Sequence, residues 1–554
     1  MGTSVQYNSG PEPKLEPLLQ HGLYDVHFSQ ATDKEFWDDG PIDIYEAFAQ
    51  HSYKTLETCN NSCDFKDDLC EARTMEQFDL IISRNLIQKQ KPFLARGQYV
   101  FEWEKKYLSY PPLNDTKTLP DLKLSKVTVE NTRQGVVGCK ILETIHGRLD
   151  VVDGYGRQRT KGDDVVRVWM KGGNNSDYAV VGNVTDLQNG SYTFSVKCLW
   201  AGSSKLHVAI AYPREFIRTV IHQVHTGVAR YMVATFDHGM AREDTICFHT
   251  PNIPGWECIC NFSKFGYENY YCGRPRHPSQ AAERLVENNY LITTENTVEE
   301  NLLHLQSCRK SNKRVTWTQT TPKGFWSPGQ VWSSLVCQDP GVINSSWTLN
   351  CLRDSSVWIF GDSNARETYN YLLNLTQCEH VQGGYQYWGH CFQPMYSLSI
   401  NVNSHEGPKY THAWSSDYFT VPSFIQKLPK NQKHILIIQY YLHYTAAHFA
   451  VLSLRMKSLR AAIEKLLEEN PNVLIGLRAP HISTWEYNEN HATGGDALGP
   501  QYMEIIRERF RGLEDKVVLL DLWEMTIGIE NADFHPPAFV NREMIKFLLS
   551  FQCL

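Results

Sequence analysis

The pattern of apolar positions changes near residue 351, and the C-terminal part of the chain alternates between two periods. Four short, continuous apolar runs are typical of buried strands: 357–362, 433–441, 472–480 and 516–523. Three longer segments carry apolar residues every three or four positions, which predicts amphipathic helices: 364–375, 449–470 and 499–513. Because strands alternate with helices, we predict an α/β domain with a parallel sheet that is covered on both faces.

The central part of the chain has a different period. Between 124 and 215, apolar and polar residues alternate in short runs such as SYTFSVK, and turn dipeptides such as Asp153-Gly154 and Asn189-Gly190 separate the runs. This pattern predicts an antiparallel β-sandwich of the immunoglobulin-like type. Many aromatic residues and five cysteines follow at 216–320. We expect a disulfide-stapled extension of the sandwich there.

These patterns predict a multidomain chain with three parts. The first, 1–120, is polar and irregular, with one helix expected at 74–90 and a proline-containing linker at 110–123. The second, 121–320, is the sandwich with its cysteine-rich extension, and the third, 321–554, is the α/β domain.

Composition supports a folded protein and gives no sign of a nucleic-acid partner. The chain has 554 residues, of which 42% are hydrophobic and 21% charged, and its net charge is −7. Lysines and arginines are scattered and form no basic stripe.

Cysteines and glycosylation acceptors indicate an oxidising compartment. The 15 cysteines do not form the matched close pairs of a zinc site, so disulfides are favoured and no metal site is predicted. Asn-x-Ser/Thr occurs at eight asparagines: Asn60, Asn114, Asn174, Asn183, Asn189, Asn261, Asn344 and Asn374. We therefore expect the secretory-pathway lumen or the extracellular space.

The N-terminal residues do not look like a targeting signal. The first 14 residues lack the apolar core of a signal peptide, and Gln6 stands where a myristoylation signal needs Ser or Thr. Nowhere do about 18 apolar residues run together, so we predict no membrane span. We expect that a leader or an anchor precedes this chain.

The strongest chemical candidate is a serine in VWIFGDSNAR, 357–366. Ser363 follows a predicted strand and opens a predicted helix, and ligands of parallel sheets bind at the carboxyl ends of strands. Gly361 permits a tight turn, and the N-terminus of a helix offers backbone N–H groups to an oxyanion. The alternative is that Ser363 merely caps the helix.

A base for this serine occurs near the C-terminus, in LLDLWEMTIGIENADFHPP. His535 lies in a loop between the last predicted strand and a closing helix, with Asp533 two residues earlier and Asp521 at the end of that strand. A Ser-His-Asp set would activate Ser363 as a nucleophile. Alone, His535 would be an ordinary loop residue.

With these motifs, the chain resembles the SGNH hydrolase superfamily, and one branch of it closely. FGDSNAR, LLDLWEMTIGIENADFHPP and LLSFQC are similar to the PC-esterase domain of the NXPE family, which combines neurexophilin and PC-esterase domains. VTDLQNGSYTFSVKCLWAGSSKLHVAIAYP is similar to that family's neurexophilin-like sandwich. The resemblance covers about 120–554.

The resemblance assigns roles to individual residues. Ser363 matches the nucleophile, His535 the base, and Arg366 the basic residue that follows the serine. Relatives carry Asp-x-x-His, whereas this chain has Asp533-x-His535, so the acid is Asp533 or Asp521, and Asp533 is favoured. In the strand IIQYYLHY the histidine of relatives is kept as His443, but the neighbouring glycine is replaced by a bulky residue. His443 is a candidate oxyanion donor, or a histidine without a catalytic role.

The resemblance implies a Golgi-luminal or secreted enzyme that acts on O-acyl groups of glycans. The main hypothesis is a glycan O-acetyltransferase with sialic acid or another sugar as acceptor and acetyl-CoA as candidate donor. One alternative is a carbohydrate O-acetyl esterase with the same site, and another is a non-catalytic ligand of a cell-surface receptor. Four residues are candidate glycan contacts: Trp388, His390, Trp414 and Trp485.

Overall fold

The structure is a computed structural model that describes most of the chain after residue 100. The described residues are 101–113, 115–134, 136–173, 177–226, 232–237, 242–247, 284–286, 291–295, 305–382, 388–405, 420–446, 449–483 and 496–553. The predicted helix at 74–90 and the cluster of Cys59, Cys63 and Cys70 lie outside them.

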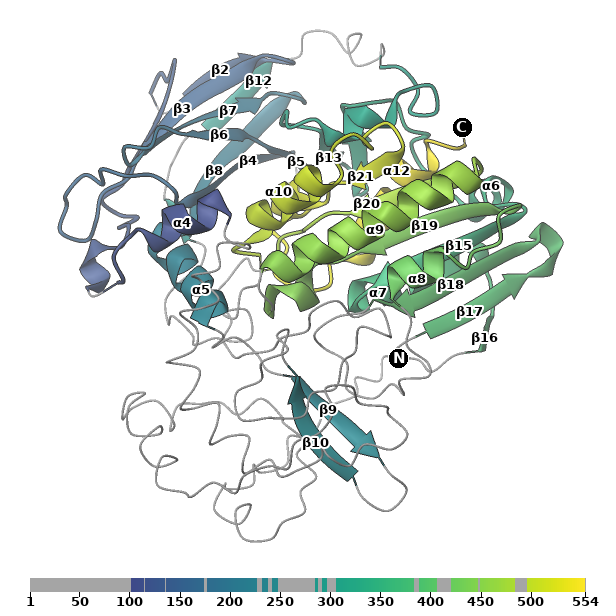
Figure 1. Cartoon of the computed structure of the whole chain (residues 1–554). Coiled ribbons are helices and arrows are strands. Elements are labelled where there is room, and N and C mark those ends of the chain that lie inside the picture. Colours follow the sequence, from purple (N-terminus) through teal and green to yellow (C-terminus); the bar gives the residue numbers. More distant parts are fainter. Residues whose placement is uncertain are drawn as a thin grey trace, which may run out of the picture. The chain divides into compact units, whose positions relative to one another are not determined.

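Two sheets form a β-sandwich in the first half of the described chain (Figure 1). One has the order β1 (Lys126–Val129), β3 (Thr144–Asp150), β7 (Ser191–Lys197), β6 (Asn183–Asp186). The other has the order β14 (Val331–Ser334), β13 (Gly324–Ser327), β5 (Tyr178–Val181), β4 (Val165–Gly172), β8 (Gly202–Tyr212), β12 (Leu291–Glu295), β2 (Val136–Lys140), and β11 (Arg284–Val286) also pairs with β8. The predicted antiparallel sandwich is thus confirmed in outline, although β12 and β2 pair in parallel.

Alternation of buried and exposed residues explains why these segments form strands. In β3, every second residue is buried, so one face of the strand packs inward and the other meets solvent. Inward-facing side chains of both sheets meet in one core that includes Leu149, Val168, Phe194 and Val208. Along the chain, β8 is followed by the helix α5 (Arg214–Thr226) and by a hairpin of β9 (Met232–Asp237) and β10 (Arg242–Cys247).

The C-terminal sheet has the order β16 (His380–Gln382), β17 (Trp388–Gln393), β18 (Leu398–Ser404), β15 (Ser355–Gly361), β19 (Lys433–Gln439), β20 (Val473–Arg478), β21 (Val517–Leu520). From β18 to β21 every pairing is parallel, whereas β16 and β17 form an antiparallel edge. The four predicted strands are therefore found, and the sheet contains three strands that the apolar pattern did not predict.

Helices cover both faces of this sheet. One apolar cluster joins α7 (Ser363–Thr376) and α12 (Ala538–Leu549) to the side chains on one face, including Val357 and Ile359. A second cluster joins α8 (Val421–Ile425), α9 (Phe449–Glu469) and α10 (Gly499–Arg509) to the other face, including Phe360 and Leu436 (Figure 1). Because the strands are buried on both faces, they read as continuous apolar runs in the sequence.

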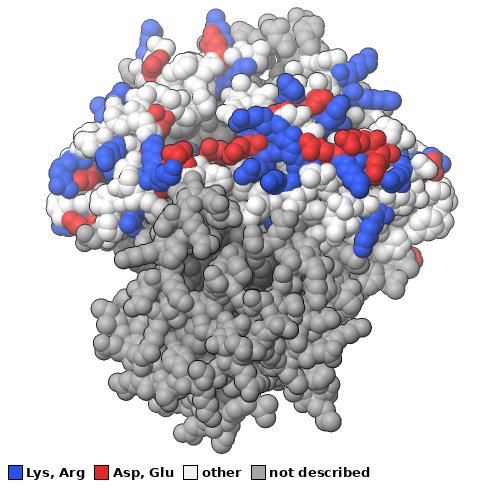
Figure 2. Space-filling view, in the orientation of Figure 1, with Lys and Arg blue, Asp and Glu red and all other residues white. Residues whose placement is uncertain are grey.

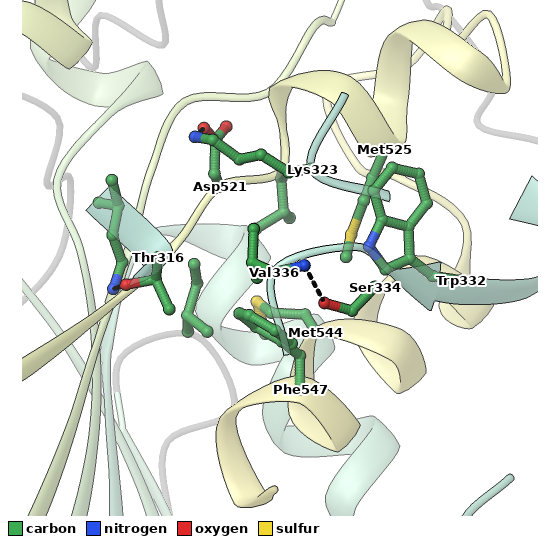
Figure 3. Close-up of a pocket in the computed structure, with 12 residues that line it drawn as sticks. Thr316, Lys323, Trp332, Ser334, Val336, Asp521, Met525, Met544 and Phe547 are labelled. Carbon is green, nitrogen blue, oxygen red and sulfur yellow. Dashed lines mark hydrogen bonds and ion pairs between the residues drawn. The ribbon is translucent and has the colours of Figure 1, made fainter. Parts of the chain in front are cut away.

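The sandwich and the α/β region pack against each other and contribute to one apolar cluster. The second cluster also takes in Ala211 and Tyr212 of β8, residues of α5, and Tyr107 of α4 (Glu102–Leu108). The hairpin β13–β14 pairs with β5, and β13 contacts α11 (Trp523–Gly528). Near it, Trp332, Met525, Met544 and Phe547 help to line a pocket that Lys323 and Asp521 border (Figure 3). The domain boundaries at 120 and 320 stay predictions.

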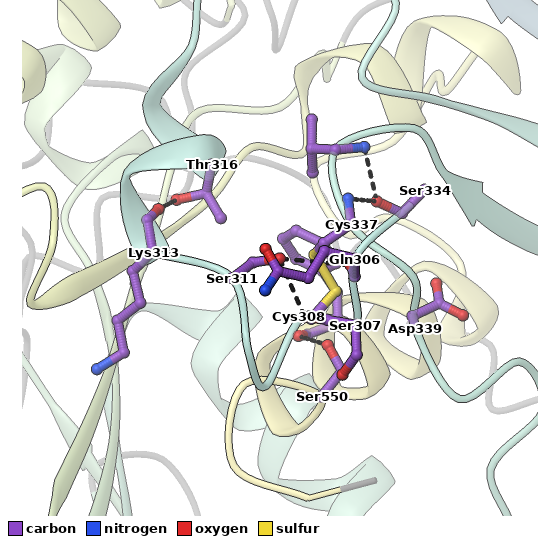
Figure 4. Close-up of a disulfide and its surroundings, with 12 residues drawn as sticks. Gln306, Ser307, Cys308, Ser311, Lys313, Thr316, Ser334, Cys337, Asp339 and Ser550 are labelled. Carbon is purple, nitrogen blue, oxygen red and sulfur yellow. Dashed lines mark hydrogen bonds between the residues drawn. A yellow bond between two sulfur atoms is a disulfide. The ribbon is translucent and has the colours of Figure 1, made fainter. Parts of the chain in front are cut away.

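Eight cysteines form four disulfides, in agreement with the prediction from the sequence. The pairs are Cys139–Cys198, Cys308–Cys337, Cys351–Cys553 and Cys378–Cys391. Figure 4 shows Cys308–Cys337 next to Ser307 and Ser311, and this disulfide joins the two ends of the segment that contains β13 and β14. Cys351, the last residue of α6 (Ser345–Cys351), bonds to a residue near the C-terminus. Of the other seven cysteines, Cys247 ends β10 and six lie outside the described residues.

Charged side chains and several glycosylation acceptors lie at the surface of the described residues. On the face that Figure 2 shows, described acidic and basic side chains are interspersed. Four glycosylation acceptors fall among the described residues, and all are exposed: Asn183, Asn189, Asn344 and Asn374. Within the described part of the chain, no helix has the length and apolar character needed to cross a membrane.

Candidate active site

Ser363 is the first residue of α7 and lies directly beyond the end of the central strand β15. The helix is capped by Asp362, whose carboxylate accepts the backbone N–H of Asn364 at 2.8 Å. The alternative that Ser363 is the capping residue is therefore wrong. Since Asp362 performs the capping, the Ser363 hydroxyl is available for another contact.

Gly361 is needed at this corner for a steric reason. A Cβ atom there would lie 2.8 Å from Cβ of Ala365 and 3.2 Å from Cβ of Gln439. Gly361 therefore lets the first turn of α7 pack closely onto the strand ends, which places Ser363 at the carboxyl edge of the sheet.

His535 meets Ser363 at this edge. Its Nε2 lies 2.7 Å from Oγ of Ser363, although the two residues are 172 positions apart in the sequence. His535 belongs to the loop between α11 and α12, and its side chain is 43% exposed. The predicted proximity of the two side chains is thus observed, and a distance of 2.7 Å is that of a hydrogen bond. Their catalytic roles stay predictions.

The two candidate acids have different positions. Oδ1 of Asp533 lies 3.8 Å from Nδ1 of His535 and accepts the backbone N–H of the same residue at 3.0 Å. The Asp533 side chain is 73% exposed. Asp521 instead forms an ion pair with Lys323 beside the pocket of Figure 3, and its other oxygen accepts the N–H of Trp523. Of the two, Asp533 is the one that faces His535.

Arg366 and His443, the other two predicted site residues, lie on different elements. Arg366 is half-buried on α7, three residues after Ser363 and therefore on the same side of the helix. His443 lies in a short 3₁₀ helix, Leu442–Ala446, that follows β19, and its ring centroid is 5.3 Å from that of His405. Burial raises the pKa of Asp362, but His443, His405, the N–H of Asn364 and Arg478 together outweigh this effect and hold that pKa below its usual range.

Arg478 is a buried residue of the site that the sequence analysis missed. It ends β20 and is 1% exposed. Its guanidinium donates to the carbonyl of Asn364 at 3.2 Å, to Oγ1 of Thr368 at 3.1 Å and to Oδ1 of Asn541 at 3.3 Å. Burial lowers the pKa of Arg478 to about 10, so the side chain stays charged at neutral pH. It joins the helix of Ser363 to the helix that follows His535.

A second missed group supports the loop of His535. Nε2–H of His481, which is fully buried, donates to the carbonyl of Phe534 at 3.1 Å. The amide of Asn531 donates to the carbonyls of Ile482 at 2.6 Å and Asp533 at 2.7 Å. Burial, with a smaller effect of the Arg478 charge, lowers the pKa of His481 to about 3, so the ring is neutral. A signal was present in GLRAPHIS, where Arg478 and His481 follow a buried strand at the same edge as Ser363.

The candidate glycan contacts are only partly within the described residues. Trp388 begins β17 in the antiparallel edge of the sheet, and Nδ1 of His390 lies 2.7 Å from Oδ1 of Asn401. Trp414 and Trp485 lie outside the described residues. Contacts with a glycan stay predictions.

Comparison with known proteins identifies the region that carries this site. Residues 332–553 match the model of the family described as "NXPE family member 4-like, C-terminal domain". Two solved structures show weak similarity. The Lin-41 filamin domain is 19% identical over 16% of this chain and 80% of its own, with a TM-score of 0.13. A family two carbohydrate esterase from Clostridium thermocellum is 13% identical over 41% of this chain and 67% of its own, with a TM-score of 0.22. Neither TM-score establishes a shared fold.

Proposed function

This chain belongs to the NXPE family, and on that premise we propose that its C-terminal region is a glycan O-acetyltransferase. The observation that carries the proposal is the 2.7 Å contact between Oγ of Ser363 and Nε2 of His535 at the carboxyl edge of a parallel sheet. A serine within hydrogen-bond reach of an imidazole, at the N-terminus of a helix, is the arrangement that nucleophilic acyl transfer needs.

The order of the strands supports an SGNH-like architecture. If the parallel strands are numbered along the chain from β15, their order in the sheet is 2-1-3-4-5, as in flavodoxin-like folds. The Gly-Asp-Ser corner follows the first of these strands, and His535 follows the last of them in the sequence. The nucleophile and the base thus come from the two ends of the domain and meet at one edge.

In the proposed reaction, Nε2 of His535 takes the proton of Ser363 while Oγ attacks the carbonyl carbon of an acetyl donor. With acetyl-CoA as donor, the C–S bond breaks and the thiol leaves with the proton that His535 returns. A sugar hydroxyl then loses its proton to His535 and attacks the acetyl-serine, which releases the O-acetylated glycan and restores Ser363. Asp533 stabilises the imidazolium that forms in each step.

The negative charge of the tetrahedral intermediate needs donors beside Ser363. Asp362 accepts the N–H groups of Asn364 and Ala365, whereas the N–H of Ser363 precedes them at the start of α7, and we propose that it is one of these donors. His443 is a second candidate donor, because it lies in the cluster around Asp362, the residue next to Ser363. Arg366 is a candidate contact for an anionic donor or acceptor.

We also propose where this enzyme works. Disulfides and exposed glycosylation acceptors both suit the lumen of the Golgi or the extracellular space, where disulfides persist. Sialic acid and other sugars of glycoproteins are available there as acceptors.

One observation favours an esterase with the same site. Because the His535 side chain is 43% exposed, water reaches the base that would activate it, and an acetyl-serine would then be hydrolysed. The remaining alternative, a receptor ligand without catalysis, gives no reason for the contact between Ser363 and His535.

Turnover with two donors tests the proposal. The purified glycoprotein is incubated with acetyl-CoA and a sialylated glycoprotein, and separately with an O-acetylated sugar, and products are measured by mass spectrometry. We expect acetyl transfer to the glycan by the wild type and none by Ser363→Ala. Ser345→Ala, which changes the first residue of another helix, should behave like the wild type. Release of acetate alone would establish the esterase, and no turnover of either donor by the wild type would contradict an enzymatic function.

A further inference from the structure

The two faces of strand β4 contact different parts of the molecule. Val168 and Met170 point into the core of the sandwich. Arg167, Trp169 and Lys171 alternate with them and therefore lie on the opposite face. There, Trp169 packs in a cluster with Ile482 and Ile527, which belong to the α/β region. This second face is thus built to hold the α/β region.

Arg167 and Trp169 are completely enclosed at this contact. Arg167 donates to Oδ2 of Asp496 at 2.8 Å, and both side chains are at most 1% exposed. The same oxygen accepts the backbone N–H of Ser483 at 3.2 Å, and the hydroxyl of Tyr212 donates to the other oxygen. Asp496 therefore fixes the segment after His481 to the sandwich.

Trp169 and Lys171 together hold Glu530. Nε1–H of Trp169 donates to Oε1 of Glu530 at 2.9 Å, and Nζ of Lys171 lies 2.9 Å from Oε2. Trp169 is itself fixed by stacking on His207, at 5.0 Å between ring centroids. Glu530 has a φ of 58°, a conformation that residues other than glycine adopt rarely, so its two donors stabilise an unusual backbone position.

Glu530 stands at the start of the loop that carries His535. The next residue, Asn531, is 5% exposed and donates to the carbonyls of Ile482 and Asp533. His481 then holds the carbonyl of Phe534, which directly precedes His535. Contacts from β4 therefore lead through Glu530 on one side and through Asp496 on the other to the backbone of this loop.

We propose that Arg167, Trp169 and Lys171 are positioning residues that fix the His535 loop, so that the sandwich is a working part of the acyl-transfer site. This inference rests on the proposed function of His535. The sandwich would then help to position the candidate base, in addition to any role in binding other molecules. The three residues act through Glu530 and Asp496 and touch no reacting atom.

Hydrogen–deuterium exchange of the full chain tests this inference without the need for activity. Lys171→Met keeps the aliphatic stem and removes the charge, and Trp169→Phe keeps an aromatic ring and removes the N–H donor. In both variants we expect exchange in the peptide 529–537 to be about fivefold faster, because loss of an anchor favours local opening. Lys140→Met, an exposed lysine on β2, is the matched control and should leave that peptide unchanged.

Two further measurements sharpen the result. Lys171→Arg keeps a cation beside Glu530, so exchange in this variant should stay close to the wild-type rate. The rate of Ser363 acetylation in Lys171→Met should fall about tenfold while KM for the donor stays the same, since only the geometry of the base changes. Exchange and acetylation equal to those of Lys140→Met would overturn the inference. If wild-type Ser363 is never acetylated, the proposed function fails, and the exchange rates alone decide whether β4 fixes the loop.

Discussion

The two halves of the candidate site are built in opposite ways. Ser363 lies at a strand-to-helix corner that residues next to it in the sequence form. Asp362 caps the helix, and Gly361 allows Ala365 to pack closely against the end of the strand. His535 lies on a half-exposed loop, and side chains from distant parts of the chain hold that loop in place.

This difference separates what local sequence determines from what the tertiary structure must supply. The candidate nucleophile, Ser363, is placed mainly by residues next to it in the sequence, although Arg478 also contacts its helix. The base depends on Glu530, Asn531 and His481, each of which contacts residues that are remote in the sequence or lie on another element. We therefore expect the His535 side to be the more easily disturbed.

The largest effect is expected for the base itself. In His535→Gln, Ser363 keeps its position but loses the group that takes its proton, and the rate of acetyl transfer should fall by about 10²–10⁴-fold. The thermal unfolding temperature should stay close to that of the wild type, because the side chain is half-exposed. Transfer at the wild-type rate would mean that another group is the base.

Breaking the link between the two halves should cost stability. Arg478→Met removes the donor that links Asn364, Thr368 and Asn541, and the free energy of unfolding should fall by about 3 kcal/mol. Urea denaturation measures this loss, and Arg309→Met, at an exposed position, serves as the control. Equal stability of the two variants would show that Arg478 does not join α7 to α12.

The pH dependence of stability tests the buried support of the loop. Burial lowers the pKa of His481 to about 3, from an ordinary value of 6.5, so the unfolded chain binds a proton below pH 6.5 that the folded chain does not. Stability from this group is present above pH 6.5 and is lost as the pH falls toward 3, by about 2 kcal/mol between pH 7.5 and pH 5.

His481→Gln keeps an N–H donor and cannot titrate, so its unfolding free energy should fall by about 2 kcal/mol less than that of the wild type over the same pH interval. Urea denaturation at pH 7.5 and at pH 5 gives the free energy of unfolding at each pH. The difference between the two values is the pH slope of each protein. His146→Gln, which changes an exposed histidine on β3, should keep the wild-type slope. A wild-type slope in His481→Gln would mean that this ring is protonated in the folded protein.

The smallest effect is expected for the acid. Asp533 is 73% exposed and 3.8 Å from the imidazole, so solvent screens its charge, and Asp533→Asn should slow acetyl transfer by less than about tenfold. The rates of acetyl transfer by Asp533→Asn and His535→Gln are measured in parallel assays and compared. A loss in Asp533→Asn as large as that in His535→Gln would mean that the carboxylate closes onto the imidazole when the donor binds.

The sequence predicted those parts of the fold and the site that depend on local pattern. The Gly-Asp-Ser corner and the strands β15, β19, β20 and β21 were visible because each is a short apolar run with a clear end. Strand β18 was missed because its apolar residues Leu398, Ile400 and Val402 alternate with Ser and Asn, whereas the strands of this region were predicted from continuous apolar runs.

The contacts that hold the His535 loop could not be predicted from the sequence, because they join residues that are remote in the chain. Arg167, Trp169 and Lys171 show a clear alternation, but their partners Asp496 and Glu530 are more than 300 residues away. A single sequence contains no signal for such a pairing. Arg478 and His481 are the intermediate case: they lie at the end of a buried strand and just after it, a signal that the sequence prediction did not use.

Mass spectrometry of the acylated protein tests whether Ser363 is the nucleophile. The wild type is mixed with acetyl-CoA, and separately with an O-acetylated sugar, then quenched with acid and digested, and the peptide that contains Ser363 is examined. We predict a single acetyl group on Ser363 with one of the two donors, its absence in Ser363→Ala, and much slower formation in His535→Gln. A folded, glycosylated wild-type protein that turns over a donor while Ser363 stays unmodified at every quench time would contradict the account.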